Sequence, residues 1–282
     1  MSDDILSSWV HRGSPEYKKQ RMAIHAILVA ITKNNPLRNH VYLKGGILMG
    51  IVYESTRYTT DIDISNTDRF DIAEKFDKDL FDQSLSLASL DLPYNLILKT
   101  QSVKIMPKKI GSFNSYRITV GYAKREPGRP EYRKLMEGES LKVIKIDYSF
   151  NESVHDEGSI IVMNNNEIKG YGIHTLVAEK YRSLMQQVTR NRKRRQDVYD
   201  LYCLINNGHT KNINKEKLKQ TIIQKCEERE NIIANIKSLD NPEIYNRAKE
   251  NYPLLADEVE EKLVDFDKAW SSILKYYKSI FD

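Results

Sequence analysis

Residues 41–65 read VYLKGGILMGIVYESTRYTTDIDIS. The apolar run 41–43 predicts a short strand, and the two glycines that follow it predict a tight turn into a helix. Residues 61–65 alternate acidic and apolar side chains with period two, which is the signature of a strand. Asp61 and Asp63 therefore project from one face of that strand, and the two isoleucines project from the other.

A second acidic position lies on another predicted strand, residues 141–150. The apolar side chains of this strand share one face, and Asp147 falls on the other. If a sheet brings Asp147 beside Asp61 and Asp63, the three carboxylates suit Mg²⁺ and suffice for a two-metal site of in-line phosphoryl transfer. Solvated residues of a polar face give the same pattern, and the spacing alone does not decide between these interpretations.

The Gly45-Gly46 pair supplies a complementary feature. A strand, a glycine turn and a helix start leave backbone N–H groups and a positive dipole end free, which is an anion site. Most Gly-Gly pairs are only turns. Followed directly by the Asp61–Asp63 strand, however, the pair indicates a nucleoside triphosphate held by its phosphates at the turn and by metal at the carboxylates.

Strands dominate the middle of the chain and helices dominate its end. Further strands are predicted over 96–105, 116–122 and 160–163, with a loop between 122 and 141, and helices over 14–33, 72–90, 173–188, 196–206, 215–233 and 257–279. Strands followed by a run of helices favour the α+β class with a helical C-terminal part. We place the domain boundary near residue 170, which gives domains 1–170 and 171–282.

Composition excludes several protein classes. The chain has 282 residues, 40% of them hydrophobic, and a formal charge of +5. Its longest apolar run, 26–31, is far short of the ~20 residues that span a bilayer, and its acidic start is unlike a secretory signal. Cys203 and Cys226 lie on helix-like segments and favour neither a disulfide framework nor a thiolate metal site. We expect a cytoplasmic globular protein without a membrane partner.

The positive charge is concentrated in two segments. Residues 101–145 carry 11 Lys+Arg against 4 Asp+Glu, and residues 180–195 carry 7 against none. Basic runs are usually a solvated face or a nucleic-acid footprint. The second run lies next to the predicted site in sequence, which favours RNA as the partner. The residues expected to contact RNA are Arg190, Arg192, Lys193, Arg194 and Arg195.

Lys180 stands in the middle of the apolar stripe of the helix predicted over 173–188. A lysine on a buried face is costly unless it is paired or directed at an anion, although its stem can also follow the stripe until the ammonium reaches water. Asp197 and Asp200 lie three apart on the next helix, so either carboxylate could pair with Lys180. Asp200 could equally be a helix cap or a surface group.

These motifs resemble the nucleotidyltransferase superfamily with a polymerase-beta-like core, whose mark is a Gly-Gly or Gly-Ser turn followed by Asp-x-Asp. More narrowly, LKGG at 43–46 and RYTTDID at 57–63 resemble the AbiEii toxin family of abortive-infection systems, which includes the MenT-type toxins. KID at 145–147, HTLVAEK at 174–180 and DVYDL at 197–201 are similar to its further motifs, in the same order. Two departures are Ile47, where the family often has Thr or Ser, and Gln196, where it usually has Arg.

The resemblance implies a fold, a set of site residues and a set of ligands. The fold is a polymerase-beta-like mixed sheet with flanking helices, the catalytic domain, followed by a helical domain that completes the active site and the acceptor surface. The implied metal ligands are Asp61, Asp63 and Asp147; the implied nucleotide contacts are Lys44, Gly45, Gly46, Arg57 and Lys180; and Lys180 and Asp197 complete the catalytic set from the helical part. The implied metal is Mg²⁺ in a two-metal site, with Mn²⁺ as the other candidate.

The implied activity is transfer of a nucleoside monophosphate from a nucleoside triphosphate to RNA, at the 3′ acceptor end of tRNA, with release of pyrophosphate. The implied role is that of a toxin in antiviral defence, with a cognate antitoxin encoded nearby that forms no stable complex with it. Two alternatives stay open: a nucleotidyltransferase that modifies a small molecule of the antibiotic type, and a non-catalytic nucleotide-binding regulator, to which the departures at Ile47 and Gln196 also point.

Overall fold

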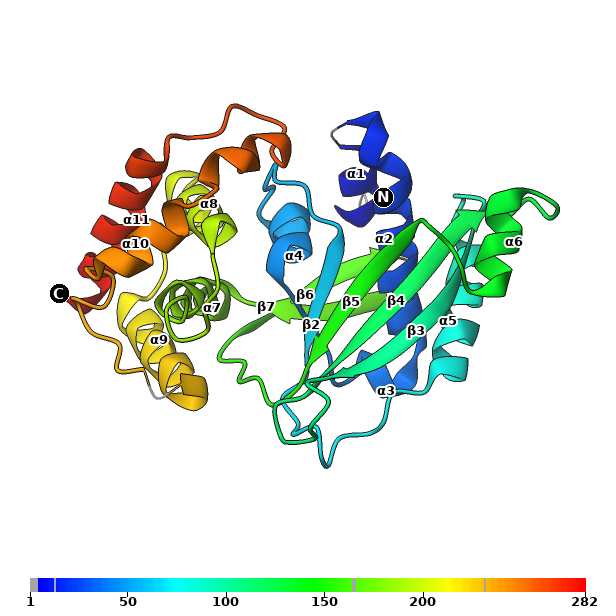
Figure 1. Ribbon diagram of the computed structural model, residues 1–282, viewed down its shortest axis with the longest axis horizontal. Helices are drawn as coiled ribbons and strands as arrows, with labels where there is room; N and C mark the ends of the chain where they lie inside the picture. The colour runs from blue at the N-terminus through cyan, green and yellow to red at the C-terminus, as the bar shows by residue number, and fades with distance from the viewer. Residues whose placement is uncertain (1–4, 13, 164–165, 231) are drawn as a thin grey trace. The chain divides into compact units, whose positions relative to one another are not determined.

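A computed structural model describes residues 5–12, 14–163, 166–230 and 232–282 (Figure 1). The chain forms two compact units. The first comprises Met1–Val52, Thr59–Glu152 and Gly158–Gly170, and the second comprises Tyr53–Tyr58, Ser153–Glu157 and Tyr171–Asp282. Two short segments thus belong to the second unit although the chain around them belongs to the first.

The first unit is built on a mixed sheet. In the described part of the chain this sheet is 7-stranded, with the order β3-β4-β5-β2-β1-β7-β6. The strands are β1 Tyr42–Lys44, β2 Asp61–Ser65, β3 Leu96–Met106, β4 Ser115–Lys124, β5 Val143–Ser149, β6 Glu157–Met163 and β7 Asn166–Tyr171. β2 is antiparallel to β1 and parallel to β5, and β4 is antiparallel to both of its neighbours. The α+β class is confirmed, and β7 is a strand that the sequence pattern did not predict.

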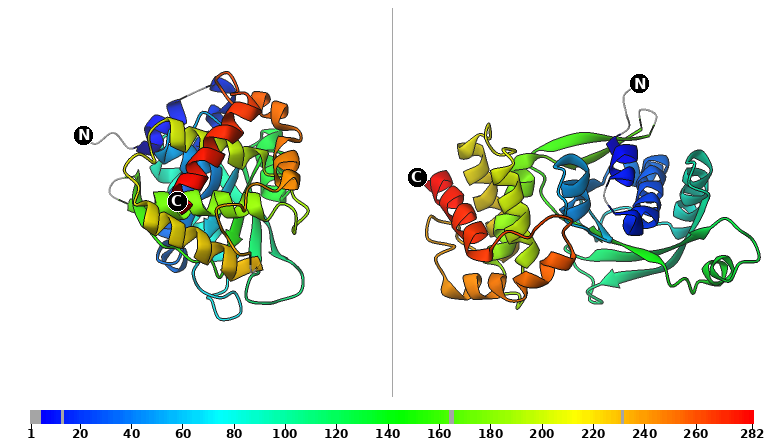
Figure 2. Two further views of the ribbon diagram at one scale, coloured as in Figure 1. Left: turned by 90° about the vertical axis from the view of Figure 1, so that its left-hand side faces the viewer. Right: turned by 90° about the horizontal axis from the view of Figure 1, so that it is seen from above.

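Helices cover the apolar face of this sheet. They are α1 Ile5–His11, α2 Pro15–Lys33, α3 Asn35–Arg38, α4 Gly45–Val52 and α5 Lys78–Asp91. α6 Pro130–Glu137 packs against β3 and β4 from the opposite face, where its Leu135 lies against Gly121. α2 packs on α1 and α5, and α1 also packs on α4, so these helices lie on one side of the strands (Figures 1 and 2). Ser14 begins α2 because its hydroxyl accepts the Glu16 N–H and Pro15 occupies the first helical position.

Two predictions in this unit were wrong: one helix begins later than predicted, and one predicted loop contains a helix. The helix predicted over 72–90 begins only at Lys78, because the Asp77 carboxylate accepts the N–H groups of Asp79 and Leu80 and caps it there. The loop predicted between β4 and β5 contains α6, which begins at Pro130 and ends where Gly138 adopts φ +85°. α6 buries only Leu135 fully, so its sequence carries little apolar periodicity.

The second unit is mainly helical. Its elements are α7 Ile173–Met185, α8 Arg195–Asn206, α9 Lys215–Glu230, α10 Pro242–Lys249, the 3₁₀ helix η1 Tyr252–Asp257 and α11 Phe266–Phe281. α7 packs on α8 and α9, and α11 packs on both of those. In its core the Tyr181 hydroxyl donates to the Ile273 carbonyl at 2.9 Å, and the rings of Tyr181 and Tyr277 are 5.0 Å apart. The helix predicted over 257–279 begins at Phe266, and α10 and η1 were not predicted.

Among the described residues, no helix combines the length and the apolar composition that crossing a membrane requires.

Candidate active site

The sheet brings the three predicted carboxylates to one face of the first unit. The parallel register of β2 and β5 pairs Asp63 with Asp147, and it pairs Asp61 with Lys145. Adjacent strands lie about 4.8 Å apart, and residues two apart on a strand share a face. The intervening Ile62 is fully buried on the opposite face, whereas the three carboxylates are partly exposed. Their common location follows from backbone pairing.

Gly45 lies directly against Asp63. It begins α4 with φ +69°, a conformation that favours glycine. A Cβ at this position would lie 2.9 Å from Cγ and 3.0 Å from Cβ of Asp63, with the carboxylate oxygen closer still. The first N–H groups of a helix have no intrahelical partner. The glycine therefore allows the carboxylate to approach the bare N-terminal backbone of α4. Ile47, the departure from the family pattern, is fully buried in the core.

A row of charged residues crosses the sheet through the carboxylates. Cα pairing runs from Lys44 to Asp63, from Asp63 to Asp147, and from Asp147 to Arg117. Arg117 donates from Nε to Asp147 Oδ1 at 3.0 Å, and this hydrogen bond, with the charges of Asp147 and Asp61, raises the pKa of Arg117. Arg117 was not predicted, because its place beside Asp147 depends on strand pairing that no local pattern shows.

Lys44 pairs with an acid outside the strands. Its ammonium donates to Glu152 Oε1 at 3.1 Å, and Glu152 is 5% exposed. A buried carboxylate needs such a partner. Glu152 thus holds the Lys44 ammonium in place beside the residues expected to contact the nucleotide. Glu152 was not identified from the sequence either, since it is distant in the chain from Lys44.

The donor chemistry of the row suits a hard divalent cation, which prefers carboxylate oxygens. The side chains themselves do not form a closed metal site: Asp147 is engaged with Arg117, and within the described residues no group of three His, Cys, Asp or Glu side chains is arranged to hold a metal ion. The backbone register fits the implied group, and Asp147 would have to leave Arg117 to help hold it.

A buried ion cluster forms in the second unit around Asp200. Lys180 Nζ lies 2.6 Å from Asp200 Oδ2 and 3.3 Å from Asp197 Oδ1. Arg57 donates to the two oxygens of Asp200 at 3.0 Å and 3.1 Å, a bidentate geometry. The sequence left Asp197 and Asp200 open as partners of Lys180. The structure shows both contacts, with Asp200 the closer. The pairing of Arg57 with Asp200 was not predicted, because the two residues are 143 positions apart in the chain.

Charge pairing in this cluster overcomes the cost of burial. Burial alone would raise the pKa of Asp200, yet the charges of Arg57 and Lys180 and their hydrogen bonds lower it to about 2. Burial likewise opposes the charged form of Lys180, but Asp200 and Asp197 raise its pKa above the ordinary value. Asp200, Lys180 and Arg57 are therefore ionised at neutral pH, and both cations are held by carboxylates.

The basic run before α8 is only partly available to a ligand. Arg195 donates to Glu258 Oε1 at 2.9 Å, Lys193 pairs with Glu250, and Arg194 Nε lies 4.0 Å from Asp197 Oδ2. Arg192 and Lys193 are exposed, whereas the side chains at 190, 194 and 195 are half-buried. The run is thus in part a set of local ion pairs.

His174, which opens the third motif, has a structural partner. Its Nδ1 lies 2.9 Å from Asp156 Oδ2, and Asp156 also accepts the Thr175 N–H at 2.7 Å. Asp156 therefore caps the N-terminus of α7 from another part of the chain. These hydrogen bonds offset the effect of burial and lower the pKa of Asp156.

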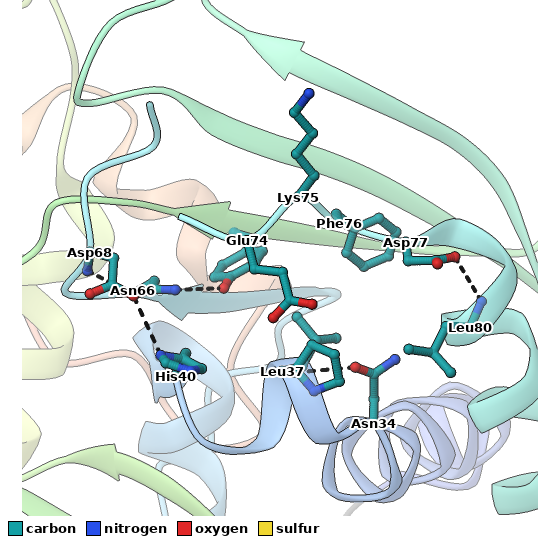
Figure 3. A pocket seen from close by; sticks show the side chains of 12 residues that line it. Asn34, Leu37, His40, Asn66, Asp68, Glu74, Lys75, Phe76, Asp77 and Leu80 are labelled. Atoms are coloured by element: carbon teal, nitrogen blue, oxygen red, sulfur yellow. Dashed lines mark hydrogen bonds and ion pairs between the residues drawn. The ribbon is translucent and has the colours of Figure 1, made fainter. Parts of the chain in front are cut away.

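One small cavity of the first unit, shown in Figure 3, has none of the three carboxylates of the row in its lining. Its volume is about 40 Å³, and its lining includes Asn34, His40, Asn66 and Tyr148. Asn66 donates to the Tyr148 hydroxyl at 2.9 Å. Tyr148 points to the helix-covered face, opposite to Asp147. A volume of this size holds a water or two and is far below that of ligand pockets. This cavity is not a nucleotide site.

The chain is similar to one described family and to several solved structures. The family described as "Nucleotidyl transferase AbiEii toxin, Type IV TA system" matches residues 26–275. None of the curated proteins compared with the chain matches it.

Among the solved structures, one assigned to a nucleotidyltransferase of H. pylori has 13% identity and a TM-score of 0.54, covering 95% of this chain and 96% of its own. JHP933 from Helicobacter pylori has 13% identity and a TM-score of 0.50, covering 96% of this chain and 94% of its own. MenT4, a nucleotidyltransferase toxin from Mycobacterium tuberculosis, has 11% identity and a TM-score of 0.48, covering 100% of this chain and 98% of its own. The two Helicobacter structures share the fold of this chain.

Proposed function

Since this chain belongs to the AbiEii family of nucleotidyl transferase toxins of type IV toxin–antitoxin systems, we propose that it transfers a nucleoside monophosphate from a nucleoside triphosphate to the 3′ acceptor end of a tRNA. The protein is a nucleotidyltransferase; the acceptor and the metal are the proposed parts. The observation that supports the transfer site best is the strand register that aligns Asp63 with Asp147, with Asp61 two residues away on the same face.

We propose Mg²⁺, or Mn²⁺ in its place, as the cation held by Asp61, Asp63 and Asp147. When bound, such ions lower the pKa of the acceptor hydroxyl and stabilise charge on the leaving pyrophosphate. Asp147 accepts the proton of that hydroxyl. At the same time the hydroxyl oxygen bonds to the α-phosphorus, and the bond between the α-phosphorus and the oxygen bridging to the β-phosphate breaks, which releases pyrophosphate. Arg117, which donates to Asp147 Oδ1, places a positive charge beside that carboxylate.

The triphosphate is proposed to bind at the glycine turn. The N–H groups of Gly45 and Gly46 at the start of α4 would donate to phosphate oxygens, and Lys44 would add a positive charge. Lys180, Arg57 and Asp197 remain proposed site residues of the second unit. Their support is the preorganisation of both cations by Asp200, which fixes positive charge at no reorganisation cost.

RNA as acceptor is supported by the exposed cations of the basic run. Arg192 and Lys193 are exposed, and Glu250, which pairs with Lys193, is exposed as well. The binding constant for a nucleic acid falls with salt concentration, and each phosphate contact that is lost reduces the slope of this log–log plot by about 0.7 to 0.9. A double substitution R192Q/K193Q should therefore weaken tRNA use and flatten its salt dependence.

A type IV toxin acts with a cognate antitoxin, and we propose that the antitoxin gene lies nearby and that the two proteins form no stable complex. Co-expression of the two tagged proteins followed by affinity capture tests this part. The proposed substrates, a nucleoside triphosphate and tRNA, are cytoplasmic molecules, so we propose the cytoplasm as the place of action and defence against phage as the role.

The acceptor is tested directly by incubating the purified protein with each α-labelled nucleoside triphosphate, Mg²⁺ and total tRNA. Labelled tRNA whose label is removed by a 3′ exonuclease supports the proposal. Label on a hydroxylated antibiotic but not on RNA would make the chain a small-molecule transferase. Nucleotide binding without any transfer would make it a regulator. Asp61→Asn serves as the matched inactive control, since it keeps the side-chain shape and removes the charge.

A further inference from the structure

A second cavity of the first unit lies where β3 begins and β4 ends, beside the start of α6. Its volume is about 250 Å³. The side chains of its lining that bear on its chemistry are Lys19, Tyr122, Lys124, Arg129, Tyr132 and Lys142. All but Lys19 come from the basic segment 101–145. Of the cations of this segment, the transfer site described above uses Arg117 alone.

This cavity is separate from the carboxylate row. Tyr122 lies on the helix-covered side of β4, together with the buried Ile118 and Val120, whereas Arg117 faces the carboxylates. Lys145 of β5 is the residue paired with Asp61. Lys142 lies three residues before Lys145, which is about 10 Å along the strand. A ligand of this cavity would therefore lie at the end of the sheet where β4 ends and α6 begins, away from the transferred phosphate.

The Tyr122 hydroxyl has no partner among the described residues, although the side chain is only 9% exposed and lines the cavity. The hydroxyl oxygen itself is not enclosed by protein, so it is open to water or to a ligand in the cavity. Burial raises the pKa of Tyr122, so the hydroxyl keeps its proton and can donate it. The Tyr122 N–H donates to the Lys142 carbonyl at 3.1 Å, which fixes these two residues side by side.

The charges of the lining leave two ammonium groups uncompensated. Glu126 pairs with Lys124 at 3.6 Å and with Arg129 at 3.2 Å. Lys19 and Lys142 have no acidic partner in the described part of the chain, and Glu131 is the one further acid of the lining. Ammonium groups beside a hydroxyl donor form an anion site, and lysine is a common phosphate-binding residue in proteins.

The start of α6 adds a second kind of contact. Its N-cap, Arg129, makes no side-chain capping bond, so the first N–H groups of the helix stay free. Tyr132, in the first turn, lines the cavity with an aromatic ring. Aromatic rings beside cations bind nucleic-acid bases by stacking, without a requirement for sequence.

We propose that this cavity binds one nucleotide, with its phosphate between Lys19, Lys142 and the Tyr122 hydroxyl and its base against the ring of Tyr132. A free nucleoside monophosphate and a single nucleotide within an unpaired RNA strand share this chemistry. The site does not depend on the transfer reaction, so its test stands apart from that of the proposed function.

The test is calorimetric binding of AMP, adenosine and a single-stranded RNA tetranucleotide, in EDTA so that no divalent cation supports binding at the carboxylates. Tyr122→Phe removes one oxygen and keeps the ring. It should weaken binding of the phosphorylated ligand by about tenfold, since a hydrogen bond to a charged group is lost. Lys142→Met should weaken it at least as much, and adenosine should bind at least tenfold more weakly than AMP.

Lys108→Met is the matched control, because Lys108 is an exposed lysine of the same basic segment and lies outside the cavity. This substitution should leave AMP binding unchanged. Equal thermal midpoints for all variants exclude unfolding as the cause of any loss. Binding of AMP alone identifies a free nucleotide as the ligand, and preferential binding of the tetranucleotide identifies RNA. Absence of both, or binding by Tyr122→Phe and Lys142→Met equal to that of the native chain, overturns the proposal.

Discussion

Replacement of Gly45 by alanine separates a structural role of the glycine turn from a catalytic one. The alanine Cβ would lie 3.0 Å or less from three atoms of Asp63, because the glycine adopts φ +69° directly against that side chain. A left-handed conformation costs a residue with a Cβ about 1–2 kcal/mol. Rotation of the Asp63 side chain moves its carboxylate away, whereas its Cβ, 3.0 Å from the added carbon, is fixed to the strand, so the clash adds to this cost.

Gly138→Ala is the matched control. Gly138 also has a positive φ, +85°, and no atom lies within 4 Å of the Cβ that it would gain. Gly138→Ala should lose about 1–2 kcal/mol of unfolding free energy in urea, and Gly45→Ala should lose at least as much. Only Gly45→Ala displaces the Asp63 carboxylate, and a displacement of about 1 Å at a reacting centre costs on the order of 100-fold in rate.

The assay is the release of pyrophosphate during transfer to tRNA, measured at a temperature where both variants are folded. Gly45→Ala should lose about 100-fold or more in kcat/KM, whereas Gly138→Ala should stay within a few-fold of the native chain. If the two variants show the same activity, the contact between Gly45 and Asp63 has no part in the reaction and the reasoning from the turn is refuted.

Lys180→Met removes one partner of the buried Asp200 and should lower the unfolding free energy by about 3 kcal/mol. Lys193→Met breaks an exposed ion pair and should lower it by less than about 1 kcal/mol, so equal losses in urea would contradict the burial argument. The pKa of Asp200 is lowered from 3.8 to about 2, so its ionised form contributes stability that is complete above pH 4 and is lost as the pH falls toward 2. Acid titrations of the native chain and of Asp200→Asn should therefore diverge in this range by about 2 kcal/mol, and parallel curves would exclude the contribution. The R192Q/K193Q double variant should reduce the salt slope of tRNA binding by about 1 to 2, and an unchanged slope would make these cations irrelevant to RNA.

The part of the site that could be predicted is the part that local patterns encode. Period-two alternation placed Asp61 and Asp63 on one face of a strand, and the glycine turn was predicted before them. The family resemblance is confirmed by the match over residues 26–275. The register that sets Asp63 against Asp147 could not be predicted, because it joins strands about 80 residues apart and strand pairing is fixed by the whole sheet.

The features that were missed have the same origin. Arg117 and Glu152 belong to the site only through contacts with residues distant in sequence, and neither stands in a motif. Asp200 was left with several roles because a carboxylate three residues after Asp197 on a helix serves equally as a cap, a surface group or an ion partner. The short helix α6 has too few buried residues to give a periodic signal.

The central claim, that nucleotidyl transfer takes place at the row of Asp61, Asp63 and Asp147, is tested most directly by one rate comparison. Pyrophosphate release from a nucleoside triphosphate in the presence of tRNA is measured for the native chain and for Asp63→Asn, with and without Mg²⁺. We expect Mg²⁺-dependent release by the native chain, and a loss of at least about 1,000-fold in a variant that keeps its fold, because a ligand of the proposed metal site has lost its charge. Release by Asp63→Asn within tenfold of the native rate would contradict the claim.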